Sequence, residues 1–267
     1  MNCKNCHIDL PEGSEFCNSC GGKVIRNRLT FRNLFEHISE TFFNYDNKLI
    51  RTFIDLIFKP EVVIGGYIDG IRKRYVNPIS YFGLAITFTG LYILILNKFF
   101  PETLDYSIFV AEGQEEFQKQ NMSFIQEYMS IFMMLYIPVY ALIASITFVG
   151  LKKLNYTELL VVFMYWQSQT SIVSAFVIII SAMFGVAGGI ISMIFLPIMV
   201  LYAAFILKRL YQLSFGQIVL RTLLFTVVLG IVLVIITILM LIIMYLTGDL
   251  EQMVEAQRAG MEAAKGG

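Results

Sequence analysis

A chain of 267 residues could form one large soluble domain or two small ones, but the composition excludes both. Hydrophobic residues make up 57% of the chain and charged residues only 15%, whereas soluble domains carry about 25% charged residues. The mean hydropathy is +0.69 and the formal net charge is zero. We therefore expect a mainly α-helical membrane protein without the clustered basic surface that binds nucleic acid.

The first 26 residues form the first predicted domain. They hold two CxxC pairs, and these contain all the cysteines of the chain: Cys3, Cys6, Cys17 and Cys20. The two-residue spacing lets both thiolates of a pair bind one ion, and two pairs complete a tetrahedral zinc site with no open position. So short a segment cannot bury a core, so metal binding must supply its folding energy, about 10–16 kcal/mol in comparable peptides. The sequence predicts a structural Zn(II) site.

Three other readings of these cysteines are weaker. The first pair and His7 match the c-type haem attachment pattern, but haem attachment would leave Cys17 and Cys20 unexplained. Disulfides are disfavoured in a reducing cytoplasm. A redox-active CxxC is expected beside a thioredoxin-like βαβ pattern, which does not surround these pairs.

The surroundings of the cysteines carry a resemblance of their own. The run 10–13 (Leu-Pro-Glu-Gly) and Phe16 before the second pair are similar to the small zinc ribbons at the N-termini of many prokaryotic membrane proteins. This resemblance implies a compact β-hairpin ribbon over about twenty-two residues.

Residues 29–78 form the second predicted segment, which is amphipathic and helical. Its apolar side chains recur every three or four residues, at Phe31, Phe35, Ile38, Phe42, Tyr45 and Leu49. This spacing predicts an apolar helical face. A second helix is expected from about residue 47 to residue 58, where Lys59-Pro60 ends it. The first helix either lies on the cytoplasmic leaflet or packs against the membrane bundle.

Three consecutive cations, Arg72, Lys73 and Arg74, precede the first expected membrane span. Basic residues at headgroup depth are typical of a membrane interface, and Tyr75 and Tyr81 fit an interfacial aromatic belt. Two roles are open for the cations. They anchor the topology of the chain, or they bind a specific anionic ligand such as a lipid.

This segment also carries a family resemblance. The residues are Arg51-Thr52-Phe53, Pro60 and the run 67–75, Tyr-Ile-Asp-Gly-Ile-Arg-Lys-Arg-Tyr. From Cys3 to about Phe82 the chain resembles the bacterial membrane family known as domain-of-unknown-function family 3667. Members of that family join an N-terminal zinc ribbon to an Arg-Thr-Phe segment, a Tyr-Ile-x-Gly-Lys-Arg-like motif and several spans. Ile71 stands where that motif has a lysine. The resemblance implies an architecture and no activity.

Residues 79–247 are predicted to form a transmembrane helical bundle. Five apolar stretches there approach or exceed the ~20 residues that cross a bilayer, at 79–96, 128–149, 159–183, 189–207 and 217–246. A helix satisfies its own backbone groups, which lipid cannot do. Glycines at 185, 188 and 189 are expected to turn the chain between the third and fourth spans.

The basic residues predict the orientation of these spans. Basic sets precede the first span, separate the second from the third and follow the fourth, at residues 72–74, 152–153 and 208–209. All fall on one side, which the positive-inside rule makes cytoplasmic. We expect a bacterial inner-membrane protein with its N-terminus inside. The acidic connection 97–127 and the C-terminal tail 248–267 are then extracytoplasmic.

The third span carries the most polar intramembrane stretch, which includes Gln167, Gln169, Thr170, Ser171 and Ser174. It either lines a path for water or substrate, or forms hydrogen bonds between helices worth about 0.6 kcal/mol each. No span has a charged residue near its centre, which disfavours an ion-coupled transporter.

Motifs of catalysis are missing from the sequence: it has no HExxH, GxSxG or GxxxxGK. We therefore expect a non-enzymatic multi-pass membrane protein that contacts lipids and whose cytoplasmic zinc ribbon is a docking or assembly module for a protein partner. The alternative is a permease or channel for small solutes or lipids that uses the polar face of the third span.

Overall fold

The computed structural model describes residues 2–22, 24, 48–104, 126–151 and 153–247. The chain forms two compact units, residues 1–48 and residues 49–267, and each is described by itself. Three predictions lie outside the described residues. They are the amphipathic stripe from Phe31 to Tyr45, most of the acidic connection and the C-terminal tail.

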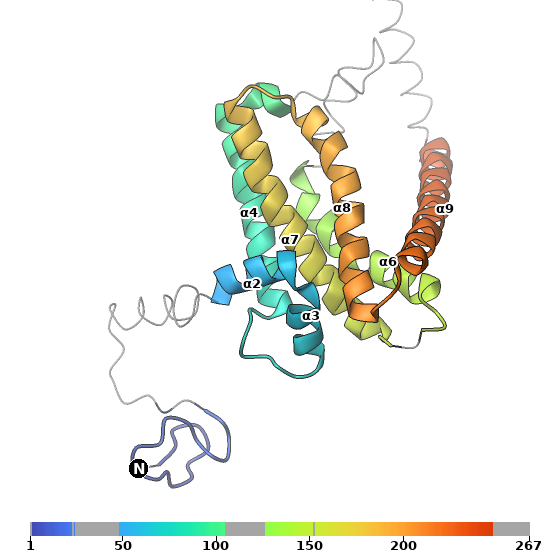
Figure 1. Ribbon diagram of the computed structural model, residues 1–267. Helices are drawn as coiled ribbons and strands as arrows, with labels where there is room; N and C mark the ends of the chain where they lie inside the picture. Colours follow the sequence, from blue (N-terminus) through green and yellow to red (C-terminus); the bar gives the residue numbers. More distant parts are fainter. Residues whose placement is uncertain (1, 23, 25–47, 105–125, 152, 248–267) are drawn as a thin grey trace, which may run out of the picture. The chain divides into compact units, whose positions relative to one another are not determined.

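Five long apolar helices make up most of the second unit (Figure 1). They are α4 (Pro78–Phe99), α6 (Met129–Thr147), α7 (Tyr156–Met183), α8 (Gly188–Tyr211) and α9 (Phe215–Thr247). All five are long and apolar enough to cross a bilayer, so the predicted spans and the mainly α fold class are confirmed. A short 3-10 helix, η1 (Pro101–Leu104), follows α4.

Local sequence signals explain where the spans begin. The Asn77 side chain accepts a hydrogen bond from the Ser80 backbone N–H (2.8 Å), and Pro78 takes the first helical position of α4. At α7, Asn155 and Glu158 form a reciprocal capping box. Each cap satisfies N–H groups that have no partner inside the helix.

A glycine turn separates the third and fourth spans, as the sequence predicts. Gly185 follows the end of α7 with a φ of +69°, in the left-handed region that glycine adopts without a Cβ clash. Its N–H donates to the Ala182 carbonyl at 3.0 Å. The chain therefore reverses within a few residues, and α8 begins at Gly188.

Helix α7 is the central helix of the bundle. It contacts α4, α6, α8 and the short helix α3, and Figure 1 shows it between α4 and α8. Its middle, from Leu159 to Ala175, contains the largest share of buried residues in the five spans. Helix α9 differs, because it packs against α6 and α8 and leaves most of its apolar side chains exposed, as a lipid-facing span would.

Helices α4 and α7 run parallel, and residues that face each other on the two helices differ by 88 in residue number. The Tyr81 hydroxyl bonds to Gln169, and the Phe88 and Phe176 rings lie 5.9 Å apart with the same separation in sequence. Helix α4 therefore starts level with Trp166, ten residues after α7 starts at Tyr156. At 1.5 Å per residue, about 15 Å of α7 extends beyond the start of α4.

Two short helices pack against α7 and α8 near the start of α4. They are α2 (Lys48–Phe58) and α3 (Pro60–Ile68), and the α2 bounds confirm the predicted helix that ends before Lys59-Pro60. Leu56, Val63 and Ile64 are fully buried in the common core. We call α2, α3 and the loop 69–77 the wedge, because α3 packs against α7 and α8, and α2 is hydrogen-bonded to both of these spans (Figure 1).

Candidate functional site

The first CxxC pair lies on a tight backbone turn. The Cys3 N–H donates to the Ile8 carbonyl at 2.8 Å, and the His7 N–H donates to the Cys3 carbonyl at 2.8 Å. His7 closes the turn with a φ of +61°, which costs a non-glycine residue about 1–2 kcal/mol. The pair turns its two side chains to the same side of the chain.

The second CxxC pair repeats this turn. The Cys17 N–H donates to the Gly22 carbonyl at 2.8 Å, and the Gly21 N–H donates to the Cys17 carbonyl at 2.9 Å. Gly21 takes the position of His7, with a φ of +68°. Glycine adopts this conformation without strain.

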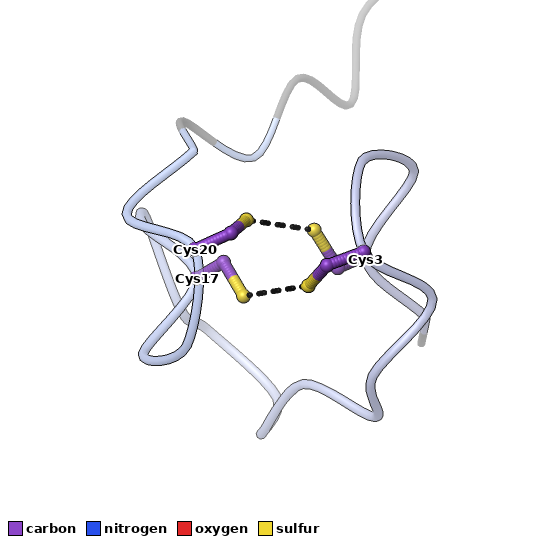
Figure 2. Close-up of side chains that lie close together, drawn as sticks. Cys3, Cys17 and Cys20 are labelled. Carbon is purple, nitrogen blue, oxygen red and sulfur yellow. Dashed lines mark hydrogen bonds between the residues drawn. The ribbon is translucent and has the colours of Figure 1, made fainter.

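The two turns bring four thiols together. All four sulfur atoms lie within 4.8 Å of one another, and Figure 2 shows the two pairs facing each other. The Cys3 and Cys20 sulfurs are 3.7 Å apart, and the Cys6 and Cys17 sulfurs are 3.5 Å apart. A tetrahedron with metal–sulfur bonds of about 2.3 Å has edges of about 3.8 Å. All four are free cysteines, so the residues fit one metal ion.

The electrostatics of the cluster also favour a cation. The Gly22 N–H and the Asn5 side chain lower the pKa of Cys20 to about 6. The Ile8 N–H lowers the pKa of Cys6, but desolvation and the neighbouring thiols outweigh it and raise that pKa to about 12. Four thiolates this close repel one another, and a bound divalent ion would remove that repulsion.

The described part of this unit has a very small hydrophobic core. Its described core is Cys3, Leu10 and Cys17, with Cys6 and Val24 against it. The β-hairpin implied by the zinc-ribbon resemblance is reduced, among residues 2–22, to isolated bridges such as the antiparallel one between Asn2 and Asp9. A metal ion bound by the four cysteines would supply most of the folding energy of residues 2–22.

The matching turns predict opposite effects for two substitutions. We expect Gly21→Ala to weaken metal binding about fivefold, because a Cβ there meets no atom within 4 Å and adds only the strain of a positive φ, about 1 kcal/mol. We expect His7→Gly to strengthen binding by a similar factor. Competition with a chromophoric chelator measures both affinities. Equal affinities in the two variants would contradict the role of these positions in the turns.

The three cations Arg72, Lys73 and Arg74 lie exposed on the loop between α3 and α4. Arg72 lies over the Tyr67 ring at 5.6 Å, and Arg74 lies over the Tyr75 ring at 5.4 Å. The aromatic belt that the sequence predicts at Tyr75 and Tyr81 is wrong. Tyr75 and Tyr81 are buried among other protein side chains and do not face the membrane interface.

The polar stretch of α7 is buried inside the bundle. The side chains of Gln167, Gln169, Thr170 and Ser171 are all buried, and Ser174 is half-buried. Most of the hydrogen bonds that these side chains form stay within α7. Gln167 donates to the Ser171 hydroxyl at 3.2 Å, and the hydroxyls of Thr170 and Ser174 donate to carbonyls of their own helix.

Gln169 is the exception, because it joins three helices. Its carbonyl oxygen accepts from the Tyr81 hydroxyl of α4 at 2.6 Å, and its amide donates to the Phe53 carbonyl of α2 at 3.2 Å. In the sequence, Gln169 belongs to the same polar stretch as its neighbours, and the pattern does not predict that it joins three helices. Its helical position offered a signal, since residues two apart on a helix point to different sides.

Further bonds fix the wedge to the bundle. The Tyr165 hydroxyl of α7 donates to the Val76 carbonyl at 2.7 Å, and the Val76 N–H donates to the Thr52 hydroxyl at 3.0 Å. The Tyr202 hydroxyl of α8 donates to the Leu56 carbonyl at 3.0 Å. That carbonyl would bond to the N–H four residues later in a continuous helix, but Pro60 has none.

Charged residues complete the attachment of the wedge. The Arg209 guanidinium of α8 lies 3.1 Å from the Glu61 carboxylate of α3. In the loop, the Tyr75 hydroxyl donates to the Asp55 carboxylate at 2.7 Å. Burial and this carboxylate raise the pKa of Tyr75 above its ordinary value. The phenol therefore stays a donor at neutral pH.

These features define a multi-pass α-helical membrane protein with an N-terminal cluster of four cysteines that could bind a metal ion. Residues 46–90 match the model of the family described as "Protein of unknown function (DUF3667)", which confirms the resemblance predicted from the sequence. The matched segment contains α2, α3, the loop and the first half of α4. It therefore coincides with the wedge and the start of the first span. No curated protein and no solved structure matches the chain.

Proposed function

We propose that the chain is a non-enzymatic multi-pass membrane protein whose N-terminal unit is a zinc ribbon that docks a protein partner. The convergence of four thiols within 4.8 Å carries this proposal. Tetrahedral sites of four thiolates select zinc or iron. Zinc(II) has no redox chemistry and suits a purely structural role.

The ligand set argues for docking over catalysis. Four cysteines fill all four positions of a tetrahedral ion, so no position stays open for a water or a substrate. Cys3 and Cys17 are buried, which shields part of the cluster from solvent. The metal then has one task, which is to hold the surface of the ribbon in a fixed shape.

That surface offers two apolar side chains to a partner. Ile8 is 45% exposed and Phe16 is 53% exposed, on a unit with a very small core. Aromatic and aliphatic anchors of this kind carry most of the binding energy at protein interfaces. We propose that the partner binds over these two residues.

The orientation follows from the positive-inside rule. We propose that the end of the bundle with Arg72, Lys153 and Arg209 faces the cytoplasm of a bacterial cell, with the ribbon on the same side of the inner membrane. The bundle is then an anchor that holds the ribbon at the membrane. The C-terminal tail would be outside.

The alternative, a permease or channel, has less support. Its candidate lining residues on α7 use their polar atoms within the protein: Gln169 bonds to Tyr81 and Phe53, and Gln167 bonds to Ser171. These contacts favour a structural role for the polar face, which was the other interpretation of the sequence.

Affinity capture from native membranes tests the docking proposal. We expect Cys17→Ser/Cys20→Ser to lose both zinc and the partner, and Phe16→Ser to lose the partner while it keeps zinc. Glu12→Gln, an exposed change on the same unit, is the control and should keep both. The proposal fails if a zinc-free protein captures the same partners as the wild type.

A further inference from the structure

The loop 69–77 presents two arginines, Arg72 and Arg74, that form no ion pair within the described residues. Arg72 and Arg74 are exposed, and within the described residues their recorded partners are the rings of Tyr67 and Tyr75. Glu61 pairs with Arg209 and Asp55 accepts from Tyr75, and within the described residues no ion pair joins either arginine to Asp69 of the same loop. We propose that Arg72 and Arg74 form a preorganised binding site for the headgroup of an anionic phospholipid.

The loop backbone is held in place from both sides. The Val76 N–H and carbonyl are both bonded, to Thr52 of α2 and to Tyr165 of α7. At the other end of the loop, the Ile71 N–H donates to the Gly66 carbonyl of α3 at 2.7 Å. A fixed backbone lowers the entropy lost when the cations bind an anion.

The cations themselves are also positioned. Each arginine stacks over a tyrosine, and cation–π contacts of this kind favour one direction of the guanidinium. Tyr67 packs edge-on against Tyr165 with centroids 6.3 Å apart, so α7 fixes the ring under Arg72. Asp55 fixes the ring under Arg74 through its bond with Tyr75. Guanidinium groups bind phosphate oxygens with paired N–H donors.

Apolar neighbours make a lipid the occupant, in preference to a soluble phosphate. Ile71 is 52% exposed next to Arg72, and Ile79 is 68% exposed in the first turn of α4. The loop leads directly into a membrane span, so these side chains lie where acyl chains begin. A phospholipid fits both the cations and the isoleucines, whereas a free phosphate fits only the cations.

This site is independent of the proposed docking function, because it depends only on the membrane location of the bundle. The sequence is compatible with two roles for the cations, a topology anchor and a specific binding site. A topology anchor needs charge alone, whereas a binding site needs charge in a fixed geometry. Tyr75 separates the two, since its hydroxyl adds no charge to the loop but holds it in place.

Native mass spectrometry of the full chain in neutral detergent tests the proposal. The probes are dioctanoyl phosphatidylglycerol, dioctanoyl phosphatidylcholine and inorganic phosphate. At about 1 kcal/mol per basic residue near an anionic surface, Arg72→Gln/Arg74→Gln should weaken phosphatidylglycerol binding about 30-fold. Lys98→Gln removes one charge at the other end of α4 and should leave binding unchanged, in contrast to each single arginine variant. Each single arginine variant should weaken binding about fivefold and carries the test if the double variant does not fold.

Tyr75→Phe should weaken binding about threefold although it removes no charge, because it loses one hydrogen bond of the frame. Wild-type affinity in the arginine variants, or an equal loss in the lysine control, would overturn the proposal. So would equal binding of the two lipids. Displacement of the lipid by free phosphate at comparable concentration would identify a soluble anion as the occupant and would also overturn it.

Discussion

Replacement of two thiolates by Cys17→Ser/Cys20→Ser is expected to abolish metal binding and unfold the N-terminal unit. The described core of this unit is three small buried side chains, whereas metal binding in comparable peptides supplies about 10–16 kcal/mol. We expect one zinc ion per wild-type chain and none in the variant. Trypsin cleavage after Lys4, inside the first turn, should become rapid when the metal is lost.

The control for this experiment lies inside the second CxxC pair. Ser19 is exposed between Cys17 and Cys20, so Ser19→Ala should keep the ion and the protection from trypsin. Acid should act like the serine variant, because thiolates must be deprotonated to bind the metal. A double serine variant that still holds one ion with full protection would show that the ribbon does not depend on these ligands.

The second large effect is expected at Gln169, where Gln169→Leu should destabilise the bundle by about 2–3 kcal/mol. The substitution breaks the bonds to Tyr81 and to the Phe53 carbonyl, and it leaves the Tyr81 hydroxyl buried without its acceptor. Gln167→Leu is the matched control. It breaks one bond within α7 and should cost about 0.6 kcal/mol. Unfolding in mixed micelles of increasing denaturing detergent measures both values.

A second substitution separates the energy of the lost hydrogen bond from the cost of leaving the Tyr81 hydroxyl buried without an acceptor. Tyr81→Phe removes the hydroxyl, so the double variant Tyr81→Phe/Gln169→Leu should be about 1 kcal/mol more stable than Gln169→Leu. Equal destabilisation by Gln167→Leu and Gln169→Leu would contradict the special role of Gln169. Additive effects of the two substitutions would show that the hydroxyl and the amide are not coupled.

The cysteine cluster and the spans could be predicted because their signals are local. A CxxC pair places two thiols on one turn, and a run of about twenty apolar residues is long enough to cross a bilayer. The start of α4 at Asn77-Pro78 lies next to the predicted residue 79, whereas α7 starts three residues before the predicted span, at the capping box of Asn155 and Glu158. Each of these features depends on residues within one or two helical turns.

The wedge could not be predicted from the sequence, because it depends on contacts between distant residues. Its position depends on how far α7 extends beyond the start of α4. The bond between Tyr81 and Gln169, which are 88 residues apart in the sequence, fixes that extension. Hydropathy gives the length of each span but not its depth relative to a neighbour. For the same reason Tyr81 was expected at the interface, whereas the extension of α7 places it in the core.

The wedge also gives the matched family segment a physical meaning. Thr52, Asp55 and Tyr75 hold the loop, and Pro60 leaves a carbonyl that Tyr202 of α8 satisfies. Residues 46–90 therefore contain the groups that attach the short helices to the bundle. This segment does not include the four cysteines, so the ribbon and the wedge are separate features with separate tests.

Zinc-dependent release of a captured partner tests the central claim most directly. The full-length protein is captured from native membranes with its partner, and a strong chelator is added while zinc and partner are both measured in the eluate. We expect the partner to leave together with the zinc and to rebind when zinc is restored. A partner that stays bound after the zinc has left would contradict the docking role of the ribbon.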